Sequence, residues 1–173
     1  MKTLLVYYSL EGNTDWVARK IAEEIDTDIL RLIPKKKRPM IGPLKFIIGG
    51  KSVIFREKPK LEEYDISVED YDCVILATPV WASGFAPALR TFLAENDLSQ
   101  KRVAIVACSG SGNAKKCMLK LRKAAGNPRV SATLSLVNPR KKQSMENEEK
   151  ILDFCGKIGL LKMKARDQKD GMA

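Results

Sequence analysis

Histidine is absent from this chain of 173 residues. Its absence excludes Ser-His-Asp triads, Cys-His dyads, His-ligated zinc and every histidine that acts as a general base. The protein therefore either borrows its chemistry from a cofactor or acts by binding alone.

Cysteines are few and scattered. Cys73, Cys108, Cys117 and Cys155 form no C-x-x-C pair and no ligand cluster, which is typical of reduced thiols in a cytoplasmic protein. Long hydrophobic runs are missing too. The run that begins at Leu4 is too short for a signal-peptide core and far too short to span a bilayer. We expect a cytoplasmic protein without a membrane span.

The length of the chain limits the number of domains, and its charge limits the kinds of binding partner. A chain of 173 residues suits one domain that buries about 70% of its surface, since a second domain would need about 100 residues or more. Lysine and arginine total 31 against 21 acidic residues, a formal charge of +10. Such an excess attracts nucleic acid, an acidic membrane, an acidic protein or a phosphorylated ligand, without choosing among them.

Five short apolar runs alternate with segments of helical periodicity. Val17, Ile21 and Ile25, which follow the first run at a spacing of four residues, illustrate the helical pattern. Runs that are apolar throughout are buried on both faces, so the pattern predicts a parallel sheet with helices on both sides. The strands are expected at residues 4–8, 29–33, 73–77, 103–107 and 130–137.

One segment interrupts this alternation. Residues 34–60 contain a run of basic residues and an apolar stretch, in which a short helix is expected at residues 43–55. We expect one domain over residues 1–161, with residues 34–60 as a basic insertion between the second and third strands. The charged tail, residues 162–173, is expected to fray.

Three loops follow carboxyl ends of the predicted strands, where open parallel sheets bind ligands. Residues 9–14 combine glycine with small hydroxyl residues before a helix, which suits an anion. Residues 78–87 place Trp81 among prolines and small residues, where its ring can lie against a planar ligand. Residues 108–113 hold two glycines that permit close backbone approach. Each loop taken alone also fits an ordinary strand-to-helix turn.

Together these loops resemble the flavodoxin family over residues 2–160, most strongly in Ser9-Leu10-Glu11-Gly12-Asn13-Thr14 and Thr78-Pro79-Val80-Trp81. The resemblance implies a three-layer α/β sandwich with a five-stranded parallel sheet of order 2-1-3-4-5. It also implies non-covalent FMN, with the phosphate in the first loop and the isoalloxazine ring between the other two. The implied cofactor-binding residues are Ser9, Leu10, Glu11, Gly12, Asn13, Thr14, Thr78, Pro79, Val80, Trp81, Ala82, Ser109, Gly110 and Gly112.

The resemblance implies electron transfer through bound FMN. One alternative is an FMN-dependent NAD(P)H or quinone oxidoreductase, favoured because the third loop lacks the tyrosine that commonly covers the outer face of the flavin. The small size and the lack of an evident nicotinamide site favour the carrier, so whether the protein is an enzyme stays open. A second alternative is a basic binding module with a degenerate flavin site. No aromatic interleaving supports nucleic acid.

The positive charge sets this chain apart from acidic flavodoxins. It predicts an acidic redox partner protein whose association slows as salt rises, or a small quinone or nicotinamide substrate for the enzyme alternative. It also predicts easier acceptance of the second electron, with Lys51 and Lys115 as the lysines expected nearest the ring. Glu11 stands where the family usually has threonine or serine, so one hydroxyl donor is lost there.

Overall fold

The structure, a computed structural model, describes residues 1–36 and 57–159. The helix expected at residues 43–55 and the tail 162–173 lie outside the described residues. The elements follow one another as β1 (Thr3–Tyr7), α1 (Asn13–Glu24), β2 (Asp28–Arg31), the 3-10 turn η1 (Val68–Asp70), β3 (Cys73–Trp81), β4 (Gly84–Phe85), α3 (Pro87–Glu95), β5 (Arg102–Ser109), α4 (Lys115–Ala124), β6 (Arg129–Val137) and α5 (Met145–Ile158).

The sheet has the predicted topology with one addition. Parallel strands lie in the order β2-β1-β3-β5-β6, which is the expected 2-1-3-4-5 when the long strands are numbered along the chain. The expectation of five strands was wrong by one, because β4 adds a sixth strand that pairs antiparallel with the end of β3. The second strand also begins one residue earlier than expected and ends at Arg31.

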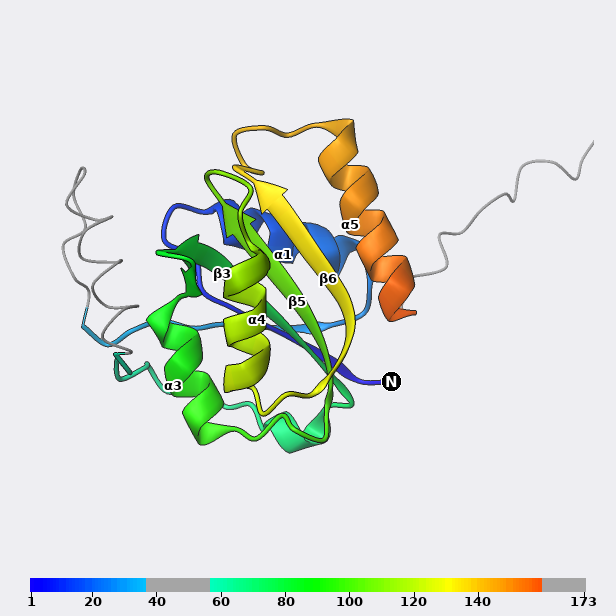
Figure 1. Cartoon of the computed structure of the whole chain (residues 1–173). Coiled ribbons are helices and arrows are strands. Elements are labelled where there is room, and N and C mark those ends of the chain that lie inside the picture. The colour runs from blue at the N-terminus through cyan, green and yellow to red at the C-terminus, as the bar shows by residue number, and fades with distance from the viewer. Residues whose placement is uncertain (37–56, 160–173) are drawn as a thin grey trace, which may run out of the picture.

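Helices cover both faces of this sheet (Figure 1). Neighbouring residues of a strand point to opposite faces, and both sets are buried in β1, in β5 and in most of β3, whereas the edge strands β2 and β6 expose part of theirs. Leu5 and Ile75 pack with residues of α1 and α5, while Leu4 and Val74 pack with residues of α3 and α4. Uninterrupted apolar strands, buried on both sides, therefore explain why the chain forms three layers.

The helices begin where the sequence pattern places them. Asp15 lies in the first turn of α1, next to the positive end of the helix dipole. The hydroxyl of Ser144 caps α5 by accepting a hydrogen bond from the Asn147 amide at 3.3 Å. Gly159, at a φ of +77°, ends that helix in the left-handed conformation.

The two ends of the basic insertion lie side by side. Pro34 and Leu61 form an isolated antiparallel bridge, and the Lys35 amide donates to the Lys60 carbonyl at 2.8 Å. All four cysteines are free and buried. Among residues 1–36 and 57–159, no helix is long and apolar enough to cross a bilayer.

Candidate functional site

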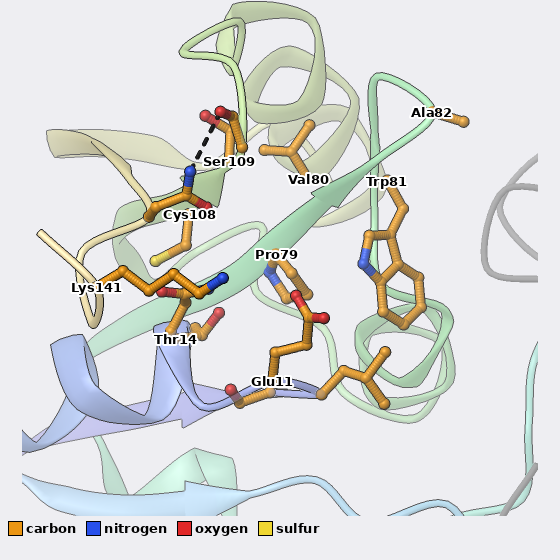
Figure 2. A pocket seen from close by; sticks show the side chains of 14 residues that line it. Glu11, Thr14, Pro79, Val80, Trp81, Ala82, Cys108, Ser109 and Lys141 are labelled. Atoms are coloured by element: carbon orange, nitrogen blue, oxygen red, sulfur yellow. Dashed lines mark hydrogen bonds between the residues drawn. The ribbon is translucent and has the colours of Figure 1, made fainter. Parts of the chain in front are cut away.

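A cleft of about 520 Å³ lies at the carboxyl ends of β1, β3, β5 and β6 (Figure 2). Its volume falls within the range of small-molecule sites, about 300 to 1,000 Å³. Its walls come from all three predicted loops and from a fourth, after β6. The lining residues are Ser9, Leu10, Glu11, Asn13, Thr14, Pro79, Val80, Trp81, Ala82, Cys108, Ser109, Gly110, Asn138 and Lys141.

The first and third loops are built in the same way. The Ser9 hydroxyl accepts a hydrogen bond from the Gly12 amide at 3.1 Å, and the Ser109 hydroxyl accepts one from the Gly112 amide at 2.9 Å. Both glycines have a φ of +87°, a conformation that a side chain disfavours. Each serine hydroxyl keeps its own proton available for donation. Two matched turns thus flank the cleft.

Thr14 sits in the first turn of α1, at the positive end of this twelve-residue helix. Its hydroxyl is buried and has no hydrogen-bond partner of good geometry among the described residues. A buried hydroxyl without a partner costs free energy, and Thr14 lines the cleft. An anionic group of a ligand would satisfy the hydroxyl and the free amides of the helix end together.

Trp81 is held at the cleft by a strained hairpin. The chain reverses between β3 and β4 through Ala82 and Ser83, both left-handed at φ of 46° and 56°. The fully buried Thr78 fixes the base of this hairpin, because its hydroxyl accepts from the Ala86 amide at 3.0 Å. The Trp81 ring meets Tyr8 edge-on, with centroids 5.6 Å apart, and extends beside the cleft in Figure 2. Non-glycine strain of this kind clusters at functional sites.

Cys108 lines the cleft but is 4% exposed. Burial raises the pKa of its thiol to about 12, with the nearby Thr14 hydroxyl opposing the rise. A thiol with so high a pKa is a poor nucleophile at neutral pH. Cys108 therefore serves as a packed core residue.

The loop after β6 supplies residues that sequence reasoning did not place at the site. The Asn138 amide donates to the Ser109 carbonyl at 2.9 Å, and its side chain donates to the Gly110 carbonyl at 3.4 Å. Lys141 reaches the cleft from the same loop. The position of this loop could have indicated it from the sequence, because the loop follows the carboxyl end of a strand at the same edge of the sheet as the three predicted loops.

The predicted residues divide into two groups. Most line the cleft, whereas Gly12, Thr78 and Gly112 do not; their contacts shape the loops instead. Lys115 was expected beside the ring, but it lines a separate hollow between α4 and β6. Lys51 lies outside the described residues. Among the described residues that line the cleft, the one cation is Lys141, because the turn at Asn138 directs the basic residues after β6 toward the first loop.

Acidic groups near the site do not form a metal centre. Among the described residues, no three cysteine, aspartate or glutamate side chains come together as a metal site would require. Asp15, next to the first loop, is engaged by Tyr7 and Arg19. Burial raises the pKa of Asp15, but the hydrogen bonds from Tyr7 and Arg19, together with the positive charges of Arg19 and Arg31, outweigh it and hold the pKa below its usual value.

Comparison with known proteins gives a consistent result. A family model described as flavodoxin matches residues 2–149. A search of curated protein sequences found no match. Three solved structures illustrate the similarity of fold: a flavoprotein from Lactobacillus acidophilus in complex with FMN, a candidate flavoprotein from Bacteroides eggerthii and the two-electron reduced flavodoxin of Megasphaera elsdenii.

The Lactobacillus protein has 21% sequence identity and a TM-score of 0.66, and the alignment covers 82% of this chain and 96% of that one. The Bacteroides protein has 19% identity and a TM-score of 0.75, with coverage of 92% and 98%. The reduced flavodoxin of Megasphaera elsdenii has 19% identity and a TM-score of 0.56, with coverage of 90% and 99%.

Proposed function

This chain belongs to the flavodoxin family, and on that premise we propose that it binds FMN non-covalently and carries electrons through the bound flavin. One observation carries the proposal. The three loops that the family resemblance assigns to FMN converge on one cleft, where the helix end suits an anion, as does the buried Thr14 hydroxyl, which has no hydrogen-bond partner of good geometry in the described part of the chain. The similar Lactobacillus flavoprotein in complex with FMN supports the same cofactor.

The residues present fit this cofactor. The phosphate would lie against the first loop, with Ser9 and Thr14 hydroxyls and the amides of α1 as donors. The ring would lie between Trp81 and the backbone of the third loop at Ser109 and Gly110. Bound FMN supplies one- and two-electron redox chemistry. The task of the chain is to hold the ring, exclude water from one face and leave an edge accessible.

A reductase remains the second candidate, and the lining of the cleft is the observation that favours it. Within the described residues, Trp81 is the one aromatic side chain among the lining residues. The third loop lines the cleft with Cys108, Ser109 and Gly110 and with no aromatic side chain, so a planar substrate such as a quinone or a nicotinamide could approach the second face of the ring.

For the carrier, we propose an acidic redox partner in the cytoplasm, a compartment that fits four free cysteines. Helix α4 follows the third loop and carries five exposed cations with no acidic residue. Lys115 and Lys116 occupy its first turn, where positive charge opposes the helix dipole. An acidic surface docked beside the cleft would relieve that repulsion and steer association.

Anaerobic absorbance spectroscopy tests the function and separates the candidates. The protein is incubated with FMN, freed of excess ligand and mixed with NADH or NADPH. A carrier keeps its oxidised spectrum under these conditions and is bleached only when a photochemical reductant supplies electrons. Bleaching by a nicotinamide, with turnover on adding a quinone, would favour the reductase. A protein that retains no flavin would refute both and leave the basic binding module.

A further inference from the structure

The loop of residues 138–144 is fixed at the mouth of the cleft by its own hydrogen bonds. The Asn138 carbonyl accepts from the amides of Lys141 and Lys142 at 3.0 and 2.9 Å. The buried Asn147 side chain donates to the Lys142 carbonyl. Asn138 itself adopts a left-handed φ of 45°, a conformation that asparagine tolerates. The position of the loop is therefore set before any ligand binds.

This loop also grips the first loop across more than a hundred residues of sequence. The Arg140 guanidinium donates to the Glu11 carbonyl at 3.0 Å, and the Arg140 amide donates to the Asn13 side chain at 3.1 Å. The guanidinium lies so close that a Cβ on Gly12 would come within 2.9 Å of its Nη1 atom. Arg140 thus holds the backbone of residues 11–13 in one conformation.

Lys141, the next residue, extends into the cleft, as Figure 2 shows in relation to Thr14 and Glu11. The charge of the first loop explains why a cation at this position would help to bind a phosphate. Residues 9–14 offer neutral donors and one charged side chain, the carboxylate of Glu11, which also lines the cleft. A phosphate dianion beside that carboxylate needs a neighbouring cation, because like charges at close range disfavour binding.

We propose that Lys141 pairs with the phosphate of the bound flavin and makes the site selective for the phosphorylated form, while Arg140 positions the phosphate loop. The proposal rests on the proposed function, because it assumes that the first loop receives the phosphate of FMN. In this proposal the positive charge at the phosphate comes from the loop of residues 138–144, more than a hundred residues after the first loop. Lys142 belongs to the same basic run but does not line the cleft.

The test compares dissociation constants for FMN and riboflavin, which differ by the phosphate alone, measured by quenching of flavin fluorescence. Lys141→Ala should weaken FMN binding by about 10- to 100-fold, the usual effect of losing a charge-assisted hydrogen bond. Riboflavin binding should change by less than about twofold. Lys141→Arg should restore FMN binding, and the matched control Lys142→Ala should leave both ligands unchanged.

Arg140→Ala has a separate readout, since a positioning residue acts on the loop. Amide hydrogen exchange at residues 11–13 should become faster in the flavin-free protein, and should stay unchanged in Lys141→Ala. Circular dichroism of each variant confirms folding; if Lys141→Ala does not fold, Lys141→Gln replaces it.

The selective role of Lys141 would be overturned if Lys141→Ala and Lys142→Ala weakened FMN binding equally. It would also be overturned if Lys141→Ala weakened the binding of FMN and of riboflavin equally. Failure of the unmodified protein to bind either flavin would instead refute the proposed function.

Discussion

Gly12 offers the sharpest test of how the cleft is built, because the chain contains a matched glycine. Gly12 and Gly112 share a φ of +87° and the same hydrogen bond to a preceding serine. They differ in surroundings. A Cβ on Gly112 would find Val137 at an ordinary 3.6 Å, whereas a Cβ on Gly12 would meet three atoms of Arg140 at 2.9 to 3.3 Å.

The magnitudes follow from these two environments. A left-handed alanine costs about 1 to 2 kcal/mol, and the smaller entropy of the unfolded alanine chain offsets about 0.4 to 1 kcal/mol of this. Gly112→Ala should therefore lower the free energy of unfolding by about 1 kcal/mol or less. Gly12→Ala should cost about 1 kcal/mol more, since Arg140 must move and give up its hydrogen bond to the Glu11 carbonyl.

Urea denaturation of the flavin-free protein, followed by circular dichroism, measures both losses. The variants are then made again in an Arg140→Ala background. There the two glycine substitutions should become equally costly, because the colliding side chain is gone. The proposed contact between the loop of residues 138–144 and the first loop is wrong if Gly12→Ala lowers the free energy of unfolding no more than Gly112→Ala does. It is also wrong if Gly12→Ala remains the more destabilising substitution in the Arg140→Ala background.

Three further predictions concern the ligand, pH and charge. Trp81→Ala should weaken FMN binding by roughly tenfold to a hundredfold through lost stacking, with little change in the melting temperature of the flavin-free protein. Because the pKa of Asp15 is lowered in the folded state, its stabilisation is present above the unfolded value of about 3.9 and is lost as pH falls below it. Acid denaturation of Asp15→Asn should accordingly show a shallower loss of stability over that window. Replacing Lys115 and Lys116 with glutamate should stabilise the flavin-free protein by about 0.3 to 1 kcal/mol per site in thermal melts at low salt, and should slow reduction of an acidic partner.

The sheet was predictable because its signal is local. Apolar runs such as residues 73–77 and 103–107 are buried on both faces, and continuous burial needs helices on both sides. The extension of β3 was not predictable in the same way. Pro79 and the small residues after it resemble a loop, yet Val80 pairs with Phe85 through a turn of two left-handed non-glycine residues. Tertiary packing, not local preference, sustains that turn.

The candidate site was predictable to the extent that each loop carries its own composition. The cleft contains most of the predicted residues because carboxyl ends of parallel strands meet at one edge. The contribution of Arg140 and Lys141 was missed because it depends on contacts to residues 11 and 13, separated by 129 and 127 positions. No local hydrophobic periodicity in the sequence indicates a contact between residues so far apart in the chain. Arg140, Lys141 and Lys142 form a basic run in the sequence, but the direction of this run toward the first loop depends on the turn at Asn138.

The proposed function depends on FMN being bound in this cleft. In the most direct measurement, the purified protein is incubated with an equal mixture of FMN, FAD and riboflavin and then freed of unbound ligand. The protein is heated, and the flavin that it releases is identified by chromatography. The loop of residues 9–14 ends in a cup suited to a terminal phosphate rather than a bridging pyrophosphate, so FMN should be recovered at close to one molecule per chain. Recovery of mainly FAD, or of no flavin at all, would contradict the account.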